Sequence, residues 1–226
     1  MKTKPRTQEN AKITQKHTHV PYRHLFWIFF VGSVVGFLLE GLWSILRLGV
    51  WENHSATVVG PFCIVYGIGA VVVYALSGRV QEKGRVQQFI IFGAAGAAVE
   101  FFASLLQEAV FGSVSWDYTN HFLNLGGRVS LQMTLIWGAL GLTFSLLVYP
   151  HLRALLQKTN GTRGRVVCIA LTAFMVGNLL LTAAAILRWR ERADALPASN
   201  EVEAFLDQTY GDATMRQIFS NMTFTD

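Results

Sequence analysis

Long apolar runs constrain this chain more than any other feature. Five segments rich in Leu, Ile, Val, Phe and Ala approach the ~20 residues that a helix needs to cross the hydrocarbon of a bilayer. Only 15% of the 226 residues are charged, against roughly 25% in a typical soluble domain. A helix satisfies its own backbone hydrogen bonds inside hydrocarbon. The sequence therefore predicts an all-α, polytopic membrane protein.

The boundaries of the predicted spans come from the basic and turn-forming segments between them. We expect five transmembrane helices, at residues 24–47, 61–76, 87–111, 129–149 and 166–187. Pro61 suits the first turn of the second helix. Pro150 is expected to end the fourth, because an interior proline removes a backbone hydrogen bond. Residues 24–192 would form one transmembrane domain, between a disordered basic tail (1–23) and a helical C-terminal segment (193–226).

Charge asymmetry between the loops predicts the orientation. Thirteen of the nineteen Lys and Arg residues fall in the N-terminal tail, residues 79–85 and residues 151–165. Because cytoplasmic loops are enriched in Lys and Arg, we expect the N-terminus in the cytoplasm and the C-terminus outside. Arg188, Arg190 and Arg192 oppose this pattern at the outer end of the last helix, and the acidic residues after them soften the conflict. The net charge of +5 thus reports orientation and not binding to nucleic acid.

The C-terminal segment contains two short helical patterns. Ser199 is expected to cap the first helix and Asp212 the second. Apolar residues recur at helical spacing in both, at Val202, Phe205, Leu206, Tyr210, Met215, Ile218 and Phe219. Two interpretations remain open: amphipathic helices on the outer membrane surface, or a lid over a site formed by the outer loops.

Ionisable side chains within the predicted spans are the first indication of a site. Glu40 lies in the outer half of the first helix, and Glu100 near the middle of the third. A charge at bilayer depth costs about 2.5–3.5 kcal/mol on insertion scales, so both carboxylates should face the protein interior. Arg128 is the expected counter-charge, and Gln132 shares its helix face. We expect these groups to line an outward-opening polar cavity; the alternative is that they join helices by hydrogen bonds.

The loop between the third and fourth helices supplies further candidate binding residues. An ordinary loop needs only turn residues and solubility, whereas this one offers an indole, a carboxylate, a phenol and an amide. They belong to Trp116, Asp117, Tyr118 and Asn124, which we expect at the mouth of the cavity. Tyr66, about one turn inside the second helix, either donates a hydrogen bond into the cavity or anchors the helix at the interface.

Several signatures of catalytic and metal sites are absent from the sequence. There is no Walker A motif, so the chain itself is not expected to hydrolyse ATP. No HExxH sequence, zinc-type Cys/His spacing or Ser-His-Asp signature is present, so no metal or cofactor site is predicted. Cys63 and Cys168 are expected near opposite membrane faces, too far apart for a disulfide.

Six short motifs occur in an order that resembles one bacterial family. They are Gly36–Glu40, Gly60–Gly67, Glu100, Trp116–Tyr118, Asn124–Arg128 and Trp137–Gly138. Together they are similar to the CmpB-like family of ABC-transporter permeases of type IV. The resemblance implies a small multi-span protein of the bacterial cytoplasmic (inner) membrane, and the permease label carries no substrate. Gly126 departs from the family pattern, in which a polar residue is more common at that position.

These features lead to three hypotheses of function. The first is a transport-system component that binds a small polar ligand or a lipid in an outward-facing cavity. It would dock a separate cytoplasmic ATPase through residues 79–85 and 151–165, although both segments lack an evident coupling helix. The second is an intramembrane enzyme acting on a lipid or lipid-linked headgroup at the outer leaflet, with a glutamate as general acid or base and an arginine for phosphate. The third is a scaffold for partner membrane proteins.

Overall fold

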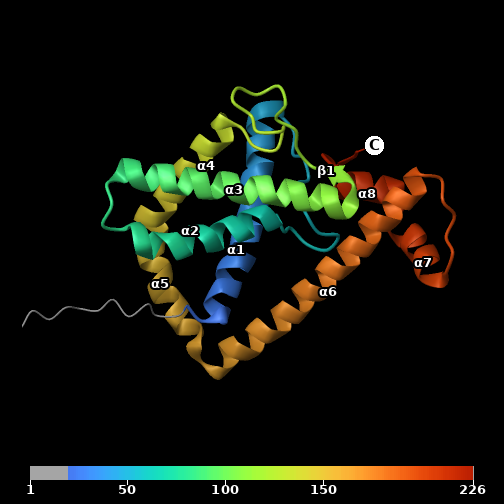
Figure 1. Ribbon diagram of the computed structural model, residues 1–226. Coiled ribbons are helices and arrows are strands. Elements are labelled where there is room, and N and C mark those ends of the chain that lie inside the picture. Colours follow the sequence, from blue (N-terminus) through green and yellow to red (C-terminus); the bar gives the residue numbers. More distant parts are fainter. Residues whose placement is uncertain (1–19, 226) are drawn as a thin grey trace, which may run out of the picture.

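Helices make up most of the structure, a computed structural model that describes residues 20–225 (Figure 1). The elements in chain order are α1 (Tyr22–Leu48), α2 (Ile64–Val80), α3 (Arg85–Phe111), β1 (Ser113–Val114), α4 (Leu131–Thr143), the π-helix η1 (Phe144–Val148), α5 (Tyr149–Gln157), the 3₁₀ turn η2 (Lys158–Asn160), α6 (Thr162–Ala193), α7 (Glu201–Thr209), α8 (Asp212–Ile218) and β2 (Thr223–Phe224). Four helical segments in this part of the chain are long and apolar enough to cross a membrane, and α2 is a shorter apolar helix. The predicted all-α membrane class is therefore confirmed.

The two ends of the membrane domain differ from the predicted boundaries. Helix α1 begins at Tyr22, so the last residues of the predicted disordered tail are helical, while residues 1–19 lie outside the described part of the chain. Helix α6 extends from Thr162 to Ala193, beyond the prediction at both ends. The arginines near its C-terminus are compatible with helix, because arginine is a good helix former and its charge is favourable in a last turn.

The chain before α2 is held extended by a contact with α1. The Cys63 N–H donates to the backbone carbonyl oxygen of Ser33 at 2.9 Å, and α2 begins only at the next residue, Ile64. Pro61 instead follows Gly60, whose φ of +80° lies in the left-handed region that favours glycine. The prediction that Pro61 opens the helix is wrong, because a tertiary hydrogen bond outweighs the local preference of proline.

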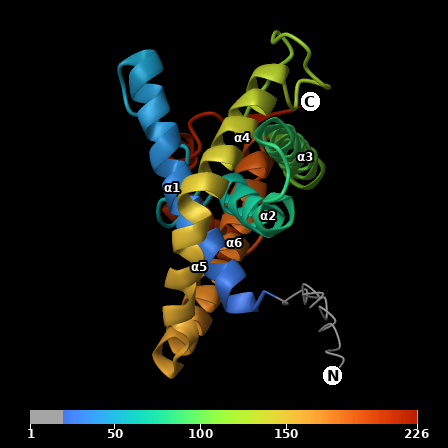
Figure 2. The same ribbon diagram turned by 90° about the vertical axis from the view of Figure 1, so that its left-hand side faces the viewer.

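The fourth predicted span is one long column that continues through Pro150 (Figure 2). Helix α4 passes into the π-helix η1 and then into α5, which has Pro150 in its first turn. The Tyr149 N–H donates to the Phe144 carbonyl, a π-type bond. Because the hydrogen-bond register has already shifted there, the missing N–H of proline costs less than in a regular helix. The prediction that the helix stops at Pro150 is wrong; it continues to Gln157.

The C-terminal segment packs on the last turns of α6 (Figure 1). Leu206 of α7, Met215 of α8 and Phe219 are buried with Trp189 of α6 in one hydrophobic cluster. The exposed side chains of the segment include Val202, which was predicted on the apolar face.

The caps of the two C-terminal helices differ from the prediction by one residue each. The side chain of Asn200 caps α7 by accepting from the Glu203 N–H at 3.0 Å. Ser199 completes this cap from the other side, because its own N–H donates to the Glu203 carboxylate at 2.6 Å. Gly211 is the residue before α8, and Asp212 is the first residue of that helix.

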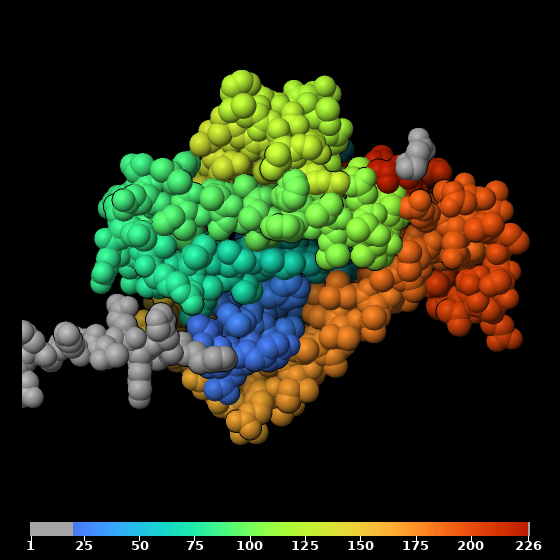
Figure 3. All heavy atoms as spheres, viewed as in Figure 1, coloured from blue at the N-terminus to red at the C-terminus, as the bar shows by residue number. Residues whose placement is uncertain are grey.

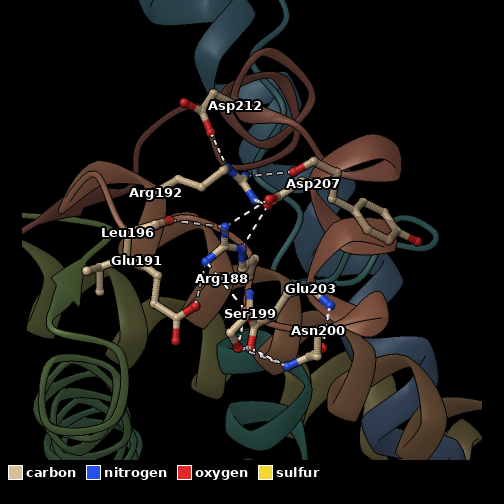
Figure 4. Close-up of polar contacts among 10 residues, drawn as sticks. Arg188, Glu191, Arg192, Leu196, Ser199, Asn200, Glu203, Asp207 and Asp212 are labelled. Carbon is tan, nitrogen blue, oxygen red and sulfur yellow. Dashed lines mark hydrogen bonds and ion pairs between the residues drawn. The ribbon is translucent and has the colours of Figure 1, made fainter.

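Ion pairs fix this segment to α6 (Figure 4). The Arg188 guanidinium is only 3% exposed and donates to both carboxylate oxygens of Asp207, at 2.9 and 2.8 Å, and to Glu191 at 2.9 Å. Arg192 donates to Asp207 at 2.6 Å and to Asp212 at 2.7 Å. Of the three arginines that oppose the charge pattern of the loops, Arg188 and Arg192 are thus matched by carboxylates of the C-terminal segment. Arg190 instead donates to the backbone carbonyl of Phe111 at 3.0 Å.

Residues 219–225 form a strap across the loops that follow α1 and α3. Strand β2 pairs antiparallel with β1, directly after α3. Beside it, the Asn221 side chain donates to the Ser115 carbonyl at 2.9 Å, and the Ser220 hydroxyl donates to the Asn53 carbonyl at 2.9 Å. The strap therefore joins the loop after α1 to the loop after α3, whereas α7 and α8, the helices of the predicted lid, lie on α6.

The ion pairs predict acid sensitivity of the C-terminal segment. Hydrogen bonds from Arg188, and then from Arg192, hold the pKa of Asp207 at about 2, below its ordinary 3.8. A depressed pKa stabilises the fold above the unfolded pKa, so this contribution is complete above about pH 4 and is lost as the pH falls toward 2. We expect cleavage of residues 195–226 by an acid protease, normalised to an unfolded substrate, to rise across this window. Asp207→Asn should be cleaved readily at both limits; a flat wild-type profile would contradict the prediction.

Candidate functional site

A cavity of about 910 Å³ lies where α1, α3, α4 and α6 surround the first turns of α2. This volume is within the range of about 300–1,000 Å³ that is usual for small-molecule sites. The loops after α1 and α3 and the strap residues Phe219–Met222 complete its wall. Most lining side chains are apolar or aromatic. In Figure 3 the α3–α4 loop projects above the face made by α2 and α3.

The first polar pair in the cavity joins α1 to α2. The Tyr66 hydroxyl donates to Oε1 of Glu40 at 2.6 Å, and both residues line the cavity. Gly36, one turn before Glu40, makes this approach feasible, because a Cβ there would lie 2.2 Å from the Tyr66 Cβ. Of the two roles expected for Tyr66, the structure has the hydrogen bond inside the cavity.

The second polar pair joins α3 to the loop that follows it. The Tyr118 hydroxyl donates to Oε1 of Glu100 at 2.9 Å. Glu100 is only 5% exposed, and its Oε2 has no hydrogen-bond partner within residues 20–225. Burial, and then the charge of the Glu100 carboxylate, raise the pKa of Tyr118. The hydroxyl therefore keeps its proton and remains a donor.

Trp137 of α4 forms an aromatic wall beside these pairs. Its ring centroid lies 5.5 Å from that of Tyr66. Two glycines leave room for the indole: a Cβ at Gly96 of α3 would lie 2.3 Å from Trp137 Cγ, and one at Gly69 of α2 would lie 2.6 Å from the ring. From the sequence, Trp137 was included only as part of a family motif. Gly69 and Gly96, each in the interior of an apolar span, are the sequence signal that a large side chain packs there.

Arg128 does not neutralise either intramembrane carboxylate. Its guanidinium pairs with Glu108 and donates to the Ser104 hydroxyl at 3.0 Å, both on α3. The expectation that Arg128 is the counter-charge of Glu40 or Glu100 is therefore wrong for this structure. Glu108 was missed, although its spacing of four from Ser104 places the two on one face of α3.

The remaining predicted residues divide between the cavity wall and the framework of the loop. Trp116, Asp117 and Gln132 line the cavity with Tyr118. Asn124 instead braces the loop internally, because its amide donates to the Thr119 carbonyl at 2.9 Å and accepts from the Gly127 N–H at 3.1 Å.

The same loop is braced at both of its ends. The Trp116 indole donates to the Arg128 carbonyl at 2.9 Å. The pKa of Asp117 is lowered, chiefly by the hydroxyl of Thr119. These contacts fix the loop residues that carry Tyr118 to the cavity.

Comparison with known proteins places this geometry in a family. The family model described as "Putative ABC-transporter type IV" matches residues 27–183, from α1 through most of α6. The chain belongs to this family. No curated protein and no solved structure matched the chain. The matched region contains both Glu–Tyr pairs and Trp137, whereas α7, α8 and the strap lie beyond it.

Proposed function

We propose that this family member is the membrane component of a transport system and that its cavity binds the transported molecule. One observation carries the proposal: carboxylates from two different helices, Glu40 of α1 and Glu100 of α3, line a single cavity. Ionisable side chains at membrane depth are costly and mark ligand or ion pathways. Each carboxylate is fixed by a tyrosine from a different element, which pre-organises the cavity for binding.

A lipid-headgroup enzyme is the second candidate function. It requires an arginine beside the reactive glutamate, to hold a phosphate. Arg128 is engaged by Glu108, outside the cavity wall formed by the described residues. Arg47 lines that wall, but it forms no ion pair with Glu40 or Glu100 among the described residues. We therefore favour ligand binding over phosphate chemistry.

Docking of a separate ATPase is proposed at the end of the bundle opposite the strap. Helix α5 is short and amphipathic, and Leu156 packs it against α1 in a core shared with Ile28. Its exposed face carries Arg153, and Lys158 follows it in η2. We propose this packed helix as the coupling element that the sequence did not reveal.

Affinity purification tests the proposed function. We expect an ATPase with a Walker A motif to co-purify in stoichiometric amount with the tagged chain after gentle extraction from native membranes, as measured by mass spectrometry. Arg153→Glu should remove the ATPase, because it inverts the charge of the α5 surface. Helix α5 packs near the start of α1, whereas Arg47 lies in the last turn of α1. The matched control Arg47→Glu should therefore retain the ATPase. Extraction of the intact wild-type chain without any ATPase would refute the proposal.

A further inference from the structure

The charge of the cavity wall indicates which class of molecule the proposed transport site accepts. Within the described residues, the wall contains four carboxylates against one guanidinium. The carboxylates belong to Glu40, Glu52, Glu100 and Asp117, and the guanidinium to Arg47. His54 and His121 also line the wall. The cavity therefore has an excess of negative charge, which opposes the binding of anions and favours cations.

The two deepest carboxylates are not balanced by the protein itself. In the part of the chain that the structure describes, each ion pair uses another carboxylate, and neither Glu40 nor Glu100 has a basic side chain within 4.0 Å. Each accepts one tyrosine hydroxyl, and Glu100 keeps a buried oxygen without a partner. A buried carboxylate of this kind is strongly stabilised by a bound cation.

Aromatic rings complete the recognition surface. Tyr66 and Tyr118 each combine a hydroxyl that holds a carboxylate with a ring that lines the cavity, and the Trp137 ring lies beside Tyr66. Trp43 and Trp116 line the same cavity. Rings of this kind attract cations at their faces, and Trp attracts them most strongly.

We infer that the cavity binds an organic cation that carries apolar substituents. The carboxylates of Glu40 and Glu100 would attract its charge, and the apolar and aromatic wall would cover its substituents. A bare metal ion fits less well, because residues 20–225 contain no group of three or more His, Cys, Asp or Glu side chains that could hold one. The inference rests on the proposed transport function and names its substrate class.

Two probes of the same shape and opposite charge test this inference. We expect purified chain in neutral detergent to bind tetraphenylphosphonium saturably, measured by equilibrium dialysis, and to bind tetraphenylborate at least about tenfold more weakly. Equal binding of the two probes, or no binding of the phosphonium, would overturn the inference. Because both arms use the wild-type chain, the result does not depend on the folding of a variant.

The double variant Glu40→Gln/Glu100→Gln supplies a second test. It should lose phosphonium binding while its melting temperature remains close to that of wild type; unchanged phosphonium binding would also overturn the inference. Added phosphatidylethanolamine distinguishes two sources of the cation. If the lipid displaces the phosphonium, the natural ligand is a lipid ammonium group; if it does not, the natural ligand is a free cation. Both results support the inference. If phosphonium binding fails while the ATPase co-purifies, the substrate class is wrong and the transport function stands.

Discussion

Replacing Glu100 by Gln is expected to weaken binding of tetraphenylphosphonium by about thirtyfold or more, equivalent to about 2 kcal/mol. The substitution keeps the shape of the side chain and an acceptor for the Tyr118 hydroxyl, but it removes the charge from a site that is only 5% exposed. Glu40→Gln should have a smaller effect, because Glu40 is only half-buried and water screens its charge more strongly. Equilibrium dialysis measures both affinities.

A control for this experiment removes the same charge elsewhere. Glu82 is exposed between α2 and α3, away from the cavity wall. Glu82→Gln should bind the probe as wild type does, and all three variants should insert into membranes normally. Wild-type affinity in Glu100→Gln would show that this carboxylate takes no part in recognition.

The second large effect is expected from Gly96→Ala. Alanine normally stabilises a helix interior relative to glycine, but here the new Cβ would lie 2.3 Å from Cγ and 2.5 Å from Cβ of Trp137. The indole would be displaced and the α3–α4 contact opened, at a cost of about 1–3 kcal/mol. We expect a lower melting temperature in detergent and a loss of phosphonium binding, because the displaced ring belongs to the cavity wall.

Gly177 provides the matched control for this substitution. It also lies within a long helix, α6, but among the described residues no atom outside the neighbouring helix backbone lies within 4 Å of the position that its Cβ would occupy. Gly177→Ala should therefore leave the melting temperature unchanged or raise it slightly. Equal destabilisation by the two alanine substitutions would show that the fit against Trp137 is not what requires glycine at position 96.

The membrane class and the two carboxylates could be read from the sequence because both rest on composition over long stretches. An apolar run predicts a span, and a glutamate inside the run predicts an inward-facing group. The partner of each charge could not be predicted in this way. Arg128 was expected to pair with Glu40 or Glu100. It pairs with Glu108 instead, because the rotation of α3 places Glu108 and Ser104 toward the start of α4.

The missed boundaries have a similar cause. Proline has a strong local preference, but a hydrogen bond between Cys63 and α1 decides where α2 begins. At Pro150, a π-type turn in the preceding residues lets the helix continue. The first depends on a contact with a distant helix, and the second on a change of helix type that proline alone does not indicate. The strap was not predicted, since its pairing with β1 joins segments more than one hundred residues apart.

A cation held against Glu40 and Glu100 should survive gentle extraction of the chain from its own membranes, and native mass spectrometry can detect it. We expect a positively charged organic molecule to remain bound to the wild-type chain and to be absent from Glu40→Gln/Glu100→Gln. A neutral or anionic molecule retained equally by both proteins would contradict the claim.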